Sequence, residues 1–256
     1  MSSDKQTEFT KENIDTYLKE IAKEYRKQIG KKMPAELILI GGASVLINYG
    51  FRDMTTDIDA LIQAASAIKD IINRVGDRYE LPAGWLNDDF KNTVSYSPAL
   101  IQYSKLYKEF SNVLTVRTVS SEYLIAMKLR SGRQFKHDLS DVLGILAEHE
   151  KNGSAVTMAQ IQKAVSDLYG DWNVLPETSR NFISNVMQDG HFEQLYLQTA
   201  SGEEETEKLL IRFEHDYPGI AKESNVDEIA GKLQKKADQT AVLAMLRTKK
   251  NSAPDV

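Results

Sequence analysis

Residues 37–62 read LILIGGASVLINYGFRDMTTDIDALI, and this stretch decides the fold. Its first four residues are apolar and predict a short buried strand. The glycine pair that follows, Gly41 and Gly42, predicts a turn, and residues 43–49 predict a helix that ends at Gly50. Two glycines let a ligand approach the backbone closely, and the N–H groups of the next helix favour an anion. The pattern suits a triphosphate, although taken alone it favours an ordinary tight turn.

Two aspartates stand near the end of the same stretch. Residues 57–62 predict a second strand, and side chains two apart on a strand point from one face, so Asp57 and Asp59 should lie side by side. Adjacent carboxylates repel each other unless a cation lies between them. Mg²⁺ prefers oxygen ligands and is typically bound by one or two carboxylates together with substrate phosphates. The pair therefore indicates a magnesium or manganese site, and a solvated strand face is the alternative.

Basic side chains that could meet a phosphate occur in two places. Arg52, just upstream of the aspartates, can pair with a carboxylate or a phosphate, or it can be a surface arginine of a loop. Asp138 and Asp141 stand one helical turn apart and should share a helix face. Charge runs of this kind are mostly surface pairs of a helix, which is the alternative here. The basic cluster that precedes these aspartates consists of Lys128, Arg130, Arg133, Lys136 and His137.

The composition bounds the class of protein. The chain has 256 residues, of which 41% are apolar and 27% charged, as expected for one large or two small globular domains. Without cysteine, disulfides, thiolate zinc sites and cysteine nucleophiles are excluded. A net charge of −5 excludes a general polyanion binder, so any nucleotide or RNA must be held locally. No signal peptide and no apolar run of roughly 20 residues is recognisable, which predicts a cytoplasmic protein with no membrane contact.

The remaining patterns predict a mixed domain followed by helices. A polar break at residues 151–154 is expected to separate residues 1–150, an α/β (α+β) domain with a mixed sheet flanked by helices, from an all-helical region over 154–256. A loop is predicted over 81–89, and Tyr103 and Tyr107 are interpreted as one face of a helix. Helices are predicted over 10–28, 65–75, 121–130, 136–149, 157–169, 176–188, 203–217 and 226–247, a third strand over 113–119, and a polar tail over 249–256.

Together these residues resemble the nucleotidyltransferase superfamily that includes DNA polymerase beta. They look more closely like the AbiEii-type nucleotidyltransferase toxins of bacterial toxin–antitoxin systems and their bacterial relatives. The shared pattern is a glycine pair that opens a helix, an Arg-x-x-Thr-x-Asp-x-Asp segment, a later helix with a lysine, and a Lys/Arg-Asp-x-x-Asp segment. The matching residues, which lie between about residues 37 and 146, are Gly41, Gly42, Arg52, Thr55, Asp57, Asp59, Lys128, Arg133, Asp138 and Asp141.

The resemblance implies transfer of a nucleoside monophosphate from a nucleoside triphosphate to a hydroxyl, with release of pyrophosphate. On this interpretation the first two aspartates ligate Mg²⁺, Lys128 balances charge on the triphosphate, and a later aspartate supports the lysine or completes the acid set. Because Lys128 shares a face with apolar Leu124, we expect it to reach into a cleft, so that Lys128→Ala spares the melting temperature. The implied catalytic set is Asp57, Asp59, Lys128, Asp138 and Asp141. The implied nucleotide-binding set is Gly41, Gly42, Ser44, Arg52, Thr55 and Arg133.

The resemblance also implies an acceptor, which is RNA, such as the 3′ end of a tRNA, or a protein; a toxin would have a cognate antitoxin. Two departures from the superfamily pattern matter. Many members have serine where this chain has Gly42, and many carry a third acid on a later strand, which residues 113–119 lack. Asp88 and Asp89, in a loop beside Trp85, are the substitutes at hand. The missing acid supports the alternative, a catalytically inactive nucleotidyltransferase fold with a binding or regulatory role.

Overall fold

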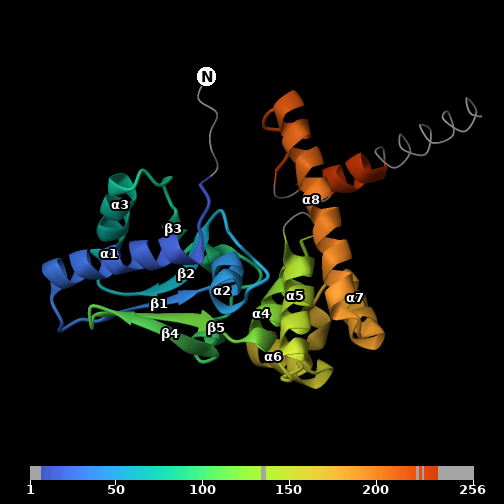
Figure 1. The fold of residues 1–256 in the computed structure, drawn as a ribbon, viewed down its shortest axis with the longest axis horizontal. Coiled ribbons are helices and arrows are strands. Elements are labelled where there is room, and N and C mark those ends of the chain that lie inside the picture. Colours follow the sequence, from blue (N-terminus) through green and yellow to red (C-terminus); the bar gives the residue numbers. More distant parts are fainter. Residues whose placement is uncertain (1–6, 134–136, 223–224, 227, 236–256) are drawn as a thin grey trace, which may run out of the picture.

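The computed structural model describes residues 7–133, 137–222, 225–226 and 228–235, and it consists of a five-stranded sheet flanked by helices (Figure 1). The strands lie in the order β3-β2-β1-β5-β4. β1 runs antiparallel to β2 and parallel to β5, so the sheet is mixed. The predicted class, a mixed sheet flanked by helices and followed by a helical region, is confirmed. The strands are Ala35–Leu39 (β1), Ile58–Gln63 (β2), Leu86–Asn87 (β3), Ser104–Phe110 (β4) and Leu114–Val119 (β5).

The strand directions bring four chain segments to the same end of the sheet. β1 and β5 are parallel and end there, at Leu39 and Val119, whereas β2 and β3 begin there. The register places Leu39 between Ala60 of β2 and Thr118 of β5. α2 (Gly41–Asn48) starts almost directly after β1. The N-terminus of α2 therefore lies at the same end of the sheet as the start of β2.

Two helices, α1 (Lys11–Ile29) and α3 (Ile68–Arg78), cover one face of the sheet. Local hydrogen bonds explain where α1 begins, because Thr10 Oγ1 accepts from the Asn13 backbone N–H at 3.4 Å and Asn13 Oδ1 accepts from that of Thr10 at 2.9 Å. The helix ends at Gly30, whose positive φ of 79° favours glycine. The fully buried side chains of this face include Ile14, Leu18, Ile21, Tyr25, Leu37 and Ile71.

At the end of the sheet where β1 and β5 end, apolar side chains of the opposite face pack against the helices that follow β5 (Figure 1). The polar break at 151–154 is the turn between α5 and α6, and a single buried apolar cluster continues across it, so the predicted division into two domains stays a prediction. That cluster includes Ile38, Leu61, Ile125, Leu146, Ile161 and Ile183. The helices are α4 (Ser121–Ser131), α5 (Asp138–Lys151), α6 (Met158–Tyr169), α7 (Glu177–Asp189) and α8 (Phe192–Asp216), and the short 3-10 helices are η1 (Asp89–Asn92), η2 (Pro98–Ile101) and η3 (Trp172–Val174).

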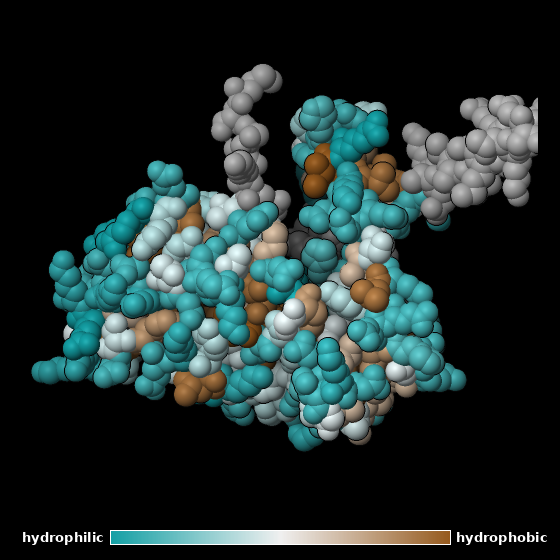
Figure 2. Space-filling view, viewed as in Figure 1, coloured by the Kyte–Doolittle hydropathy of each residue, from teal (hydrophilic) through white to brown (hydrophobic). Residues whose placement is uncertain are grey.

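Most of the molecular surface shown in Figure 2 is hydrophilic, and its apolar side chains are scattered. The exposed large apolar residues belong to different elements, among them Leu106 of β4 and Ile211 of α8. None of the helices in the described part of the chain has the length and apolar character that crossing a bilayer requires. The apolar side chains of the described residues thus serve mainly the two buried clusters.

Two strands were not expected from the sequence. Residues 81–89 do not form a continuous loop, because Leu86 and Asn87 form β3 and pair with β2. The interpretation of Tyr103 and Tyr107 as one helix face is wrong, since Tyr107 lies within β4, which pairs antiparallel with β5. Lysine and glutamate are poor strand formers, but pairing with a neighbouring strand outweighs that preference.

The other differences concern where helices begin and end. Gly41 and Gly42 are the first two residues of α2 instead of a separate turn before it. α8 begins at Phe192, well before the predicted residue 203. Lys136, the predicted tail and most of the predicted helix over 226–247 lie outside the described residues.

Candidate active site

The glycine pair is packed against three side chains from the loop and strand that follow α2. Gly41 has a φ of +55°, a conformation that favours glycine, and a Cβ there would lie 3.8 Å from Asp59 Oδ2. A Cβ at Gly42 would lie 2.6 Å from Thr55 Oγ1 and 3.1 Å from Arg52 Nη2. The turn therefore holds its backbone close to the arginine, the threonine and an aspartate of the second segment.

The two aspartates of the first motif occupy different positions at the start of β2. Asp57 is exposed and comes just before the strand, and Asp59, the second strand residue, is half-buried. The carbonyl oxygen of Asp59 accepts from the backbone N–H of Ile40 at 3.0 Å, which fixes β2 against the chain leading into α2. A carboxylate beside glycine backbone, with a second carboxylate two residues earlier in the chain, suits a hard cation that shares its ligands with phosphate. The residues present therefore fit Mg²⁺ or Mn²⁺, and Asp57 and Asp59 would hold it.

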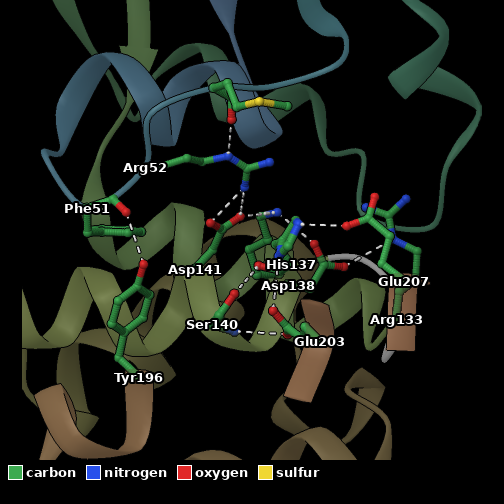
Figure 3. A network of polar contacts seen from close by, with 12 residues as sticks. Phe51, Arg52, Arg133, His137, Asp138, Ser140, Asp141, Tyr196, Glu203 and Glu207 are labelled. Carbon is green, nitrogen blue, oxygen red and sulfur yellow. Dashed lines mark hydrogen bonds and ion pairs between the residues drawn. The ribbon is translucent and has the colours of Figure 1, made fainter. Parts of the chain in front are cut away.

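Arg52 connects this segment to the N-terminal turn of α5 (Figure 3). Its Nε donates to the carbonyl oxygen of Met54 at 2.9 Å. Its Nη1 donates to both carboxylate oxygens of Asp141, at 2.8 and 2.7 Å. Asp141 is only 2% exposed, so the ion pair is shielded from solvent on the carboxylate side. One guanidinium thus contacts the loop before β2 and α5 together, which ties the glycine turn to the helices.

Lys128 of α4 contacts Asp141 and is itself buried. Its Nζ is 2.7 Å from Asp138 Oδ1 and 2.8 Å from Asp141 Oδ2. Arg133 Nε is 3.0 Å from the other oxygen of Asp138. Burial raises the pKa of Asp138, but the charges of Lys128 and Arg133 outweigh it, so that its pKa is below the ordinary value. Burial lowers the pKa of Lys128, and here too the two carboxylates outweigh it and raise that pKa. Asp138 is therefore ionised and Lys128 is charged.

Residues from both predicted motifs are linked by a continuous series of contacts. Gly42 lies against Arg52, Arg52 pairs with Asp141, and Asp141 pairs with Lys128. The Lys128 ammonium is held by two carboxylates, and its predicted contact with triphosphate charge stays a prediction. Of the two roles left open for Asp138 and Asp141, these contacts favour support of the lysine.

Two other residues considered for the site, Ser44 and Asp88, make contacts other than those expected. Ser44 is fully buried, and its Oγ accepts from the backbone N–H of Val119 at 3.1 Å, so this hydroxyl contacts β5. β3 places Asn87 opposite Asp59, which brings the following residue, Asp88, near the start of β2. Asp88, however, pairs with Lys91 at 3.0 Å. Within the described ranges, no group of three Asp, Glu, His or Cys side chains gathers as a metal-binding cluster.

Two side chains of α8 that the sequence did not single out also reach this network. Tyr196 contacts the residue before Arg52, and Glu203 contacts the first turn of α5 (Figure 3). No sequence signal marks them, because their partners are 145 and 63 residues away along the chain.

Comparison with protein-family models gives a match over residues 16–149 to the family described as "Nucleotidyltransferase of unknown function (DUF6036)". The match covers just over half of the 256 residues and includes every residue of both predicted motifs. It ends within α5 and does not include α6 to α8. No curated protein and no solved structure matches the chain.

Proposed function

Because this chain belongs to the family of nucleotidyltransferases of unknown function, we propose that it moves a nucleoside monophosphate from a nucleoside triphosphate to a hydroxyl, with magnesium. The observation that carries the proposal is the packing of the glycine turn against Asp59, Thr55 and Arg52. A Cβ at Gly42 would lie 2.6 Å from the threonine hydroxyl, so only a residue without a side chain leaves this space open.

The proposed roles follow from position. The first N–H groups of α2 have no partner within the helix and favour an anion, so they would bind phosphate oxygens. Asp57 and Asp59 would hold the divalent ion, which when bound neutralises charge on the triphosphate and the leaving pyrophosphate. Arg52 would orient the phosphates from beside Gly42. The acceptor hydroxyl oxygen forms the new bond to the α-phosphorus, the bond to the bridging oxygen breaks, and the hydroxyl proton passes to solvent.

The acceptor we propose is a hydroxyl of RNA, such as the 3′ end of a tRNA, or of a protein. A net charge of −5 argues for recognition over a small surface. Several basic side chains of the second motif already contact protein groups: Lys128 and Arg133 pair with aspartates, and Arg130 donates to the carbonyl oxygen of Val174. If the protein is a toxin, its partner is a cognate antitoxin that covers the site.

The test uses each labelled triphosphate (ATP, GTP, CTP and UTP) with Mg²⁺ and, in separate reactions, total RNA or a protein lysate. We expect one labelled product class, which identifies the acceptor, and its loss on chelation and in Asp59→Asn. Asp70→Asn, an exposed aspartate on α3, is the matched control and should label as the unaltered protein does. Equal labelling by the Asp59→Asn variant would contradict the proposal.

A second function is favoured by one observation: within the described part of the chain, no third acidic side chain joins Asp57 and Asp59 in a metal-binding group. Without it, the site could bind a nucleotide and not turn it over. Calorimetry separates the two functions: magnesium-dependent nucleotide binding without a labelled product from any acceptor would favour the binding protein.

A further inference from the structure

α8 lies outside the part of the chain that matches the family, yet it contacts both sides of the Arg52–Asp141 ion pair. One contact is to the loop that carries Arg52, and the other is to the helical turn that carries Asp141 (Figure 3). These two segments are far apart in sequence, and the ion pair links them directly.

The first contact fixes the backbone just before Arg52. Tyr196 OH donates to the carbonyl oxygen of Phe51 at 3.0 Å. The two rings pack edge to face, with their centroids 5.4 Å apart. The Phe51 ring also lies on Gly144 of α5, where a Cβ would come within 2.6 Å of it. The residue before Arg52 is therefore held between α5 and α8, with its carbonyl and its ring both engaged.

The second contact fixes the start of α5. Glu203 is 7% exposed, and its Oε1 accepts from the backbone N–H of Ser140 at 3.2 Å. Its Oε2 lies 3.2 Å from His137 Nδ1. His137 stands at the N-cap of α5 and makes no capping bond with its own side chain. Glu203 therefore supplies, from another helix, the carboxylate that a helix N-terminus favours.

Both contacts affect the positions of the side chains around Lys128. Asp138 and Asp141 are the first and fourth residues of α5, so a shift of its first turn would move both carboxylates. A shift of the backbone at Phe51 would move Arg52 away from Gly42. Misplacement of a positioning group by about 1 Å can cost about 10²-fold in rate.

We propose that Tyr196 and Glu203 are positioning residues, through which α8 holds Arg52 and Asp141 in register with the glycine turn. The inference rests on the proposed transfer reaction. It makes the C-terminal helical region an integral part of the active centre, although neither side chain touches the reacting groups.

The test compares Tyr196→Phe and Glu203→Gln with matched changes at exposed positions of the same region, Tyr217→Phe and Glu204→Gln. Tyr196→Phe removes only the hydroxyl, and Glu203→Gln keeps an oxygen acceptor but removes the charge. We expect kcat/KM to fall roughly tenfold to a hundredfold in the first two variants, with the protein still folded at the assay temperature. The two controls should keep the unaltered kinetics. The fall in kcat/KM should exceed any fall in the fraction of folded protein. If the two residues had only a structural role, kcat/KM would fall no further than the folded fraction.

A second readout does not need enzymatic activity. Phenylglyoxal modifies accessible arginines, and peptide mass spectrometry reports the labelling of Arg52. Labelling should rise several-fold in Tyr196→Phe and Glu203→Gln and stay unchanged in the controls. Unchanged Arg52 labelling, or unchanged kinetics in both variants of an active enzyme, overturns the inference. If the unaltered protein transfers nothing, the proposed function fails separately, and Arg52 labelling still decides whether α8 holds the ion pair.

Discussion

At the scale of single residues, Asp141 is the point where the two motifs meet. Arg52 binds its oxygens from one side and Lys128 from the other. A buried carboxylate is costly unless it is paired, and here it has two cations. This explains why a lysine can be buried in α4 at 8% exposure without losing its charge.

Burial changes the expected effect of removing Lys128. A lysine in an open cleft could be replaced with little loss of stability, whereas Lys128→Ala would leave Asp138 and Asp141 with one cation each. We expect the free energy of unfolding to fall by about 3 kcal/mol, the lower end for breaking a buried ion pair. Urea denaturation measures it, with Lys163→Ala, an exposed lysine paired with Asp167, as the control that should change little. An unchanged unfolding midpoint for Lys128→Ala would show that the pair contributes nothing.

The close packing around Gly42 gives a second prediction at the scale of residues. It also explains why this chain has glycine where many members of the superfamily that it resembles have serine. Thr55 is 2% exposed and has little room to move, so the Cβ of Gly42→Ala would force it and Arg52 aside. We expect a loss of about 1–3 kcal/mol in stability, as for an overpacked core, together with weaker nucleotide binding. Gly50→Ala, where a Cβ would meet nothing within 4 Å, should change neither. Denaturant unfolding measures the stability and calorimetry measures nucleotide binding. Equal stability and equal binding in the two variants would show that a Cβ at Gly42 does not displace Thr55 and Arg52.

At the scale of elements, the junction of α5 and α8 should respond to pH through His137. The hydrogen bond to Glu203 outweighs burial and raises the pKa of His137 above its ordinary value of 6.5. Protonated His137 therefore stabilises the fold. That contribution is fully present below the unfolded-state pKa, about 6.5, and is lost as the pH rises through the raised folded-state pKa.

The corresponding experiment measures the stability of His137→Gln against the unaltered protein at pH 5.5 and at pH 9. We expect the difference in unfolding free energy to be larger at the lower pH. His215→Gln, whose side chain is exposed and lies beside Asp216, is the control and should show a smaller pH dependence. A difference for His137→Gln that grows with pH would have the wrong sign and would exclude this ion pair.

At the scale of the whole molecule, the helices after residue 151 complete a core that the sheet begins. The buried cluster contains Leu61 of the sheet, Leu146 of α5, and Ile161 and Ile183 of later helices. Removing the later helices would expose the apolar faces of α4 and α5. Such exposed apolar surface leads to aggregation.

We therefore expect a fragment of residues 1–151 to be insoluble or to lack a cooperative melt. The complementary experiment cuts the full chain within residues 151–154 after folding. The two pieces should then elute together in gel filtration, because the shared cluster holds them. A soluble, cooperatively folding 1–151 fragment would instead establish two independent domains.

Features that depend on near neighbours along the chain could be predicted from the sequence. The apolar run and glycine pair of residues 37–42 predicted strand and helix in the right order, and β5 followed from its β-branched residues. Capping bonds and side-chain periodicity act over a few residues, so they can be recognised without knowing the fold. The same local pattern predicted the strand that contains Asp59, although β2 begins at Ile58, one residue after Asp57.

Which charges are buried and which side chains contact each other depends on how distant segments fold together. β4 carries Lys105, Lys108 and Glu109, and it is a strand because it pairs with β5. The sequence predicted that Lys128 reaches into a cleft, but folding places its ammonium between two carboxylates of α5. Tyr196 and Glu203 reach the site across long stretches of chain. The physical reason is that a charge or hydroxyl is costly to bury alone, and its partner is supplied by chain folding, which brings distant segments together.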